Sequence, residues 1–136
     1  MKLINTIEFE KLGDDRGSLV SLEQYKNIPF EVKRIYYIFG TKEGISRGFH
    51  AHKNLEQVAI CVKGSCRFLL DDGKNKEEII LDNPSIGLCI KNIIWREMHD
   101  FSEDCVLLVL ASELYDESDY IRNYQEFLKN LTDHNT

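Results

Sequence analysis

Short runs of apolar residues recur at intervals of about ten residues as far as residue 112, and turn-forming residues separate them. The run 31–39 is rich in β-branched and aromatic residues, which favour strands. Asp72 and Gly73 form a dipeptide typical of a tight hairpin turn between two such runs. This pattern predicts an all-β sandwich or barrel. The expected strands span residues 18–23, 31–39, 55–62, 66–70, 76–81, 85–90, 93–101 and 105–112.

After residue 112 the apolar spacing changes to that of a helix. Apolar residues then follow one another at spacings of three, three, one and three, which puts them on one helical face. Ser118 or Asp119 is expected to cap the N-terminus of this helix. The predicted fold is therefore an all-β barrel with a C-terminal α-helix. The apolar face consists of Ile121, Tyr124, Phe127, Leu128 and Leu131.

Length and composition indicate one globular domain over residues 1–136. A hydrophobic fraction of 43% and a charged fraction of 29% are ordinary for a soluble protein. A core of this size needs neither disulfides nor a metal. The net charge is −6 and no basic stripe is visible, which argues against a nucleic-acid partner. A small anionic ligand held by a few arginines remains compatible with this charge.

No segment predicts secretion or a membrane. The N-terminal residues lack the apolar run of a signal peptide, and no stretch approaches the length of a membrane span. The cysteines lie in apolar, strand-like runs without a CxxC motif, as expected for reduced core thiols of a cytoplasmic protein. They are Cys61, Cys66, Cys89 and Cys105.

The segment 47–52, Arg-Gly-Phe-His-Ala-His, holds the strongest candidate chemistry. On a strand, residues i and i+2 point to the same face, so His50 and His52 project together. Arg47 precedes them at a bend flanked by glycine. A lone histidine is more often structural, but two imidazoles inside a small barrel are costly to bury without partners. The pair therefore indicates a functional site.

The spacing around these histidines resembles the first motif of the cupin superfamily. That motif is a glycine, His-x-His, a glutamate and a later glycine, matched here by Gly44, His50, His52, Glu56 and Gly64. Metal-binding cupins carry a further histidine in a second motif, soon after a turn like that of residues 84–87. Residues 88–91 are Leu-Cys-Ile-Lys, with no histidine. We therefore expect no metal and no other cofactor.

A narrower resemblance covers residues 5–128. In order along the chain, DDRGSLVSLE, IPFEVKRIYYIF, RGFHAHKNLEQV, GSCRFLLDDG, WREMHDFSEDCVLLVLAS and YDESDYIRNYQEF resemble the sugar 3,4-ketoisomerases that act on dTDP-4-oxo-6-deoxyglucose. The resemblance implies a cupin jelly-roll barrel, a homodimer with strand exchange and a metal-free reaction. It also implies that the ketone moves from C4 to C3 through an enediol. The product would serve the synthesis of 3-amino-3,6-dideoxy sugars for bacterial surface glycans such as lipopolysaccharide and S-layer glycans.

This chemistry suits the histidine pair. We expect His50 to be the base at C3, because the pKa of histidine lies near the operating pH. His52 is then the second proton carrier, or the group that orients His50. Arg47 is permanently charged and is expected to stabilise enolate charge or bind phosphate.

Other candidates would contact the rest of the substrate. Arg34 and Tyr36 share one strand face, and we expect Arg34 to bind the diphosphate and Tyr36 to bind a sugar hydroxyl or relay a proton. Both could instead face solvent or a subunit interface. Arg67 is a further phosphate candidate, with a solvated strand position as the alternative. By resemblance, Arg16 and Gly17 lie near the sugar and match the version associated with a galacto-configured C4; they could also be a simple turn.

Three other functions are compatible with parts of the pattern. A dTDP-sugar 3,5-epimerase also uses barrel histidines. A metal-dependent cupin dioxygenase would bind iron through His50, His52 and Glu56. A non-catalytic sugar-binding cupin would use the barrel only to hold its ligand.

Overall fold

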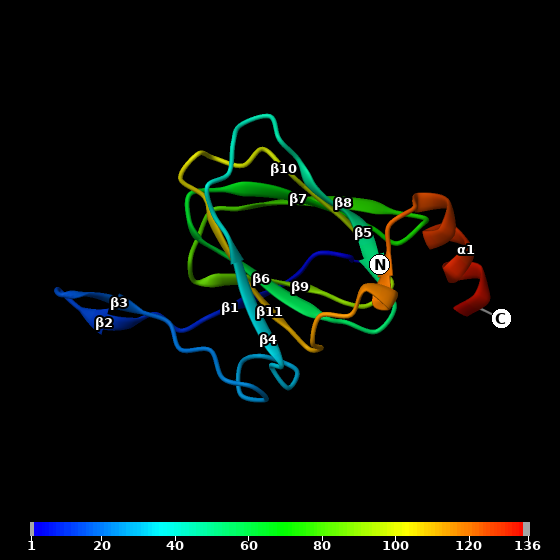
Figure 1. The fold of residues 1–136 in the computed structure, drawn as a ribbon. Coiled ribbons are helices and arrows are strands. Elements are labelled where there is room, and N and C mark those ends of the chain that lie inside the picture. The colour runs from blue at the N-terminus through cyan, green and yellow to red at the C-terminus, as the bar shows by residue number, and fades with distance from the viewer. Residues whose placement is uncertain (1, 135–136) are drawn as a thin grey trace.

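The computed structural model describes residues 2–134, which form two facing antiparallel sheets and a C-terminal helix (Figure 1). The predicted all-β barrel with a terminal helix is thus confirmed. The first sheet has the order β1 (Asn5–Glu8), β9 (Ile86–Ile90), β6 (Gln57–Lys63), β11 (Val106–Ala111), β4 (Arg34–Ile38). The second has the order β12 (Tyr120–Ile121), β5 (Arg47–His52), β10 (Trp95–His99), β7 (Cys66–Asp71), β8 (Lys76–Leu81).

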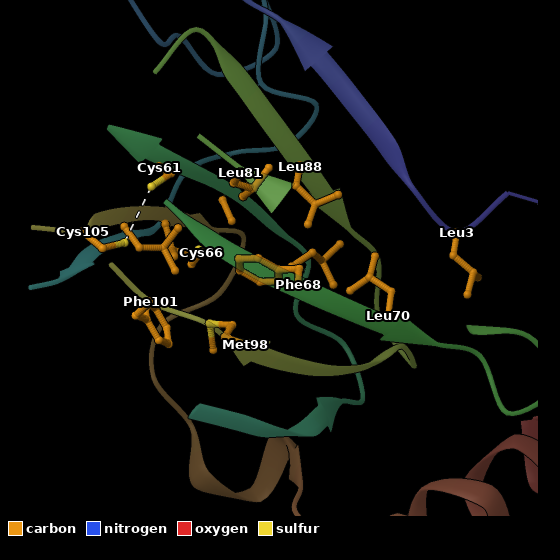
Figure 2. Packing of buried hydrophobic residues seen from close by; sticks show 14 residues of the cluster. Leu3, Cys61, Cys66, Phe68, Leu70, Leu81, Leu88, Met98, Phe101 and Cys105 are labelled. Atoms are coloured by element: carbon orange, nitrogen blue, oxygen red, sulfur yellow. Dashed lines mark hydrogen bonds between the residues drawn. The ribbon is translucent and has the colours of Figure 1, made fainter. Parts of the chain in front are cut away.

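The main core lies between the two sheets (Figure 2). Central strand β6 is buried on both faces, which explains its nearly continuous apolar sequence. Ala59 and Cys61 face the interior core. Val58 and Ile60 belong to a second cluster, which includes Ile28 and is formed with the segment that precedes β4. The alternating side chains of β6 therefore contribute to the main core on one face and to the second cluster on the other.

Helix α1 (Tyr124–His134) packs beside the second sheet (Figure 1). Phe127 is fully buried there, with its ring centroid 5.8 Å from that of Trp95. The predicted cap was wrong. Asn123 performs this role, since its side-chain oxygen accepts a hydrogen bond of 3.1 Å from the backbone N–H of Glu126. In residues 2–134 no helix has the length and apolarity needed to cross a membrane.

The helix begins later than predicted because residues 117–121 have other roles. Ser118 and Asp119 lie in a 3₁₀ turn, Glu117–Asp119, whose N-cap is Asp116. Ile121 belongs to β12, which pairs with β5. The chain thus crosses the end of the second sheet before it turns into α1.

A two-stranded hairpin stands away from the barrel (Figure 1). Its strands are β2 (Leu12–Asp14) and β3 (Gly17–Leu19), and all six of their residues are exposed. The expected strand 18–23 therefore ends at Leu19 and takes no part in either main sheet. An isolated hairpin of this length has too few contacts to be stable alone.

Replacing Phe127 by Ala should reduce the free energy of unfolding by about 3–5 kcal/mol, because it leaves a cavity between α1 and the sheet. Urea denaturation followed by circular dichroism measures this change. Ile80→Ala is the control, since Ile80 is 63% exposed on β8. Equal losses in the two variants would show that α1 contributes little to stability.

Candidate active site

A cavity of about 480 Å³ opens between the two sheets, where β4 faces β5 and the segment that follows β11. Four of the predicted site residues line this cavity, namely Arg34, Tyr36, Arg47 and His50. The complete lining is Arg34, Tyr36, Ile38, Arg47, Gly48, His50, Met98, Tyr115, Tyr120 and Arg122.

Strand β4 contributes the first wall by simple alternation. Arg34, Tyr36 and Ile38 line the cavity, while Ile35 and Tyr37 are 58% and 63% exposed. The predicted shared face of Arg34 and Tyr36 is confirmed, and it points into the barrel.

Strand β5 contributes the second wall through a bulge. Strict alternation would put Arg47 and His50 on opposite faces. The register with β10 shifts at Arg96/Glu97, which leaves Phe49 as an extra residue with φ of +61°. Gly48 has φ of +93°, and a Cβ there would lie 3.0 Å from the carbonyl oxygen of Arg96. The bulge therefore requires glycine at position 48 and brings Arg47 and His50 to one cavity.

The two histidines lie edge to face, with ring centroids 5.0 Å apart. His52 is 1% exposed and lies behind His50 without lining the cavity. Its Nδ1 is 3.0 Å from Oδ2 of Asp119. Because a carboxylate accepts the hydrogen bond, the proton is assigned to Nδ1 and the lone pair to Nε2. The ring of Tyr120 packs against both imidazoles, at 5.0 and 4.3 Å between centroids.

Asp119 is itself held by the chain that follows β5. The backbone N–H of Asn54 donates to its Oδ1 at 2.8 Å, and that of Leu55 donates to its Oδ2 at 3.4 Å. The carboxylate is therefore fixed before it contacts His52. Asp119, which sequence reasoning took for a helix cap, thus links the chain after β5 to the His52 ring.

A hydrogen-bonded chain supports Tyr36 from below. Arg96 is fully buried and donates to the side-chain oxygen of Gln57. The amide nitrogen of Gln57 in turn donates to the Tyr36 hydroxyl oxygen at 3.0 Å. Since this oxygen already accepts a hydrogen bond, the hydroxyl proton is directed elsewhere, and the cavity is the open side.

Burial and charge set the protonation states of these groups. Burial, reinforced by the Arg96 charge, lowers the pKa of His50 to about 4 and that of His52 to about 2. Burial raises the pKa of Tyr36. At neutral pH the site therefore combines two uncharged imidazoles, which can accept protons, with a tyrosine that keeps its proton.

Several buried polar atoms of this site lack partners. Within residues 2–134, the buried side-chain nitrogen and oxygen atoms without a hydrogen bond all belong to Arg34, His50, His52 and Arg96. Buried polar groups are rarely left unpaired, so these atoms are available to a polar ligand. The atoms are Nε and Nη2 of Arg34, Nδ1 of His50, Nε2 of His52 and Nε of Arg96.

Three predicted substrate contacts lie outside the cavity. Arg67 alternates with the inward-facing Cys66 and Phe68, so it points outward, where it pairs with Glu78 and Asp100. The structure does not bring Arg67 to the site.

Arg16 and Gly17 lie at the turn of the projecting hairpin, away from the cavity of their own chain, and Arg16 pairs with Asp14. Glu56, the third ligand that a cupin dioxygenase would need, is not among the lining residues.

Sequence reasoning missed the residues that close the cavity from the C-terminal side. Arg122 lies 4.1 Å above the ring of Tyr120, and Tyr115 lies 5.7 Å from the guanidinium of Arg34. The available signal was the run 115–122, in which two tyrosines and an arginine separate the last long strand from the helix. No periodicity reveals that this run crosses the mouth of the barrel.

Known proteins resemble the chain over almost its full length. The family described as FdtA: WxcM-like, C-terminal matches residues 2–132. The TDP-4-oxo-6-deoxy-alpha-D-glucose-3,4-oxoisomerase of Aneurinibacillus thermoaerophilus is 60% identical over 123 residues, which are 90% of this chain and 88% of the relative.

Two solved structures share the fold. The TDP-quinovose 3,4-ketoisomerase of Campylobacter jejuni is 54% identical, with a TM-score of 0.91 over 96% of this chain and 100% of that one. The sugar 3,4-ketoisomerase of Thermoanaerobacterium thermosaccharolyticum, in complex with TDP, is 45% identical, with a TM-score of 0.93 over 97% and 96%.

An NMR titration of the His50 ring should give a midpoint near pH 4, well below the ordinary value of 6.5. The His50→Asn variant assigns the signal. Because the unfolded chain takes up these protons at higher pH, the free energy of unfolding should fall as the pH drops from about 6.5 towards 4. A midpoint near 6.5 would contradict the effect of burial and of Arg96.

Proposed function

The chain belongs to the FdtA family of WxcM-like, C-terminal proteins, and we propose that it moves the ketone of TDP-4-keto-6-deoxyglucose from C4 to C3. Its close relatives are sugar 3,4-ketoisomerases, which supports an isomerase over a dioxygenase or a binding-only cupin. The observation that carries the proposal is the set of unpartnered buried atoms on Arg34 and His50, which line the cavity, and on His52 and Arg96, which do not line it. They supply cations for an anionic substrate and neutral imidazoles for proton transfer.

Arg34 is our candidate for the diphosphate. Its Nε and Nη2 are buried without partners, and this pair of donors matches two oxygens of a phosphate. Arg47 and Arg122 line the same cavity and add positive charge. Complexes of the relative from Thermoanaerobacterium thermosaccharolyticum contain TDP and, in a histidine-to-asparagine variant, TDP-4-keto-6-deoxyglucose.

The reaction needs a base at C3 and a proton donor at C4. The C4 ketone acidifies the hydrogen on C3. His50 removes it as a proton, and Tyr36 gives its hydroxyl proton to the C4 oxygen, which forms the enediol; the charge of Arg96 stabilises the negative charge that develops. The Tyr36 oxyanion then takes the O3 proton, and the proton held by His50, or by His52 as the second carrier, returns to C4 and leaves the ketone at C3.

Product NMR after reaction in D₂O tests the proposal. The expected product has its ketone at C3 and deuterium at C4, since the proton returned to C4 comes from groups that exchange with solvent. We expect a galacto-configured C4, on the resemblance of Arg16 and Gly17. A C3 ketone is the group that an aminotransferase needs to make a 3-amino-3,6-dideoxy sugar. An unchanged sugar would overturn the proposal.

A homodimer with exchanged hairpins accounts for the exposed surfaces. Strand β4 is an edge strand whose outer face and continuation expose Ile35, Tyr37 and Phe39 by 58%, 63% and 69%. The projecting hairpin needs a packing partner. If each hairpin crosses to the other subunit, Arg16 and Gly17 can reach the partner's cavity. The four cysteines are free thiols, which suits our proposal of a cytoplasmic location.

His50→Asn should abolish both ketone transfer and deuterium exchange at C3, with a loss of about 10²–10⁴-fold, because a general base contributes this much. His52→Asn should reduce ketone transfer more than C3 exchange, since the enediol still forms and returns to substrate. NMR in D₂O measures both rates. The roles are reversed if His50→Asn retains C3 exchange and His52→Asn does not; a loss below tenfold in both variants excludes the pair from catalysis.

Asp119→Asn should lower kcat by about 10- to 100-fold with little change in KM, because Asp119 fixes the tautomer of His52 without lining the cavity. Steady-state kinetics measure the effect, and ¹⁵N NMR reports the His52 tautomer. Asp116→Asn is the matched control, as it removes an exposed carboxylate from the same turn. An unchanged tautomer and kcat would exclude a positioning role.

Ile35→Arg should convert a dimer into a monomer by light scattering at micromolar concentration, because it places a charge on the apolar face of β4. Ile80→Arg should not, although Ile80 is exposed to a similar extent on the edge strand β8. A monomeric unsubstituted protein, or identical masses for both variants, would contradict the proposed dimer.

A further inference from the structure

Three cysteine sulfurs meet at one point of the core, outside the cavity (Figure 2). Cys61 lies near the end of β6, Cys66 begins β7, and Cys105 directly precedes β11. Each residue is 1% exposed. Their sulfur atoms all lie within 4.8 Å of one another, and those of Cys61 and Cys105 are 3.6 Å apart. Among the described residues, no other group of three potential metal ligands lies this close together.

Two crossing loops hold the sulfurs in this position. The backbone N–H of Ser65 donates to the Ser102 hydroxyl at 2.9 Å, and that of Ser102 donates to the Ser65 carbonyl at 2.9 Å. The backbone N–H of Cys105 donates to the Ser102 carbonyl at 3.1 Å. The loop between β6 and β7 is thereby tied to the loop that leads into β11. The cluster is thus preorganised by hydrogen bonds between the two loops that do not involve the thiols.

We propose that Cys61, Cys66 and Cys105 bind one soft monovalent metal ion of the copper(I) type. Cysteine thiolates are soft ligands that select such ions. For metal–sulfur bonds of about 2.3 Å, a planar three-coordinate site separates its sulfurs by about 4 Å. The observed sulfur separations need only small adjustments to reach this geometry. Zinc favours a fourth ligand, and the cluster offers three.

Cysteine binds a metal ion as the thiolate, so the thiol protons of Cys61, Cys66 and Cys105 pass to solvent when the ion binds.

Anaerobic titration of the full-length chain with copper(I), in competition with a chromophoric chelator, tests the proposal. Metal is added during refolding from urea, so that burial does not limit entry. We expect one ion per chain and at least a tenfold loss of affinity in Cys61→Ser, Cys66→Ser and Cys105→Ser. Cys89→Ser is the matched control, since Cys89 is the remaining cysteine and lies outside the cluster. X-ray absorption at the copper edge should show three sulfur ligands.

Serine at a buried position can prevent folding, so Cys→Ala variants at the same three positions and the melting temperature of the unsubstituted protein provide second readouts. Copper(I) should raise the melting temperature of the unsubstituted and Cys89→Ser proteins and leave that of the Cys→Ala variants unchanged. The proposal is overturned by the absence of stoichiometric binding, by binding that persists in Cys61→Ala, or by loss of binding in Cys89→Ser. It is also overturned if zinc(II) binds to the three thiols and copper(I) does not.

Discussion

The buried charge of Arg96 is the constraint on which the rest of the active site depends. Arg96 is 1% exposed, and its hydrogen bonds go to neutral oxygens, those of the Gln57 side chain and the Ile94 backbone. Burial lowers the pKa of its guanidinium to about 10, so it stays charged at neutral pH. Burial, reinforced by this charge, keeps His50 and His52 uncharged, and Arg96 fixes the hydroxyl of Tyr36 through Gln57. A base and an acid thus coexist at one pH because burial lowers the pKa of the imidazoles and raises that of Tyr36.

How far the sequence predicts this arrangement depends on whether a contact follows strand alternation. Alternation is local, so it correctly placed Arg34 with Tyr36 on one face and His50 beside His52. It cannot explain why Arg47 joins His50, because that depends on a bulge whose partner is in β10.

Contacts with residues distant in the sequence also determine the structure near the C-terminus. Asp119 has the residue type and position of a helix cap, yet a histidine 67 residues away determines its role. Arg122 and Tyr120 reach the cavity through the path of the chain across the barrel, which no local pattern encodes. Arg67 shows the converse, since the same alternation that buries its neighbours places it outside, between two carboxylates.

Within one strand of the barrel, some residues stabilise the core and others belong to the active site. Strand β6 has apolar residues on both faces where it crosses the core, yet its first residue, Gln57, belongs to the active-site network. An unpaired buried polar group costs about 1–3 kcal/mol of folding free energy. The unpartnered atoms of Arg34, His50, His52 and Arg96 therefore reduce the stability of the free protein. The large apolar core offsets that cost. A substrate that supplies phosphate oxygens to the Arg34 donors removes part of it, so groups that weaken the free fold favour binding of the anionic sugar.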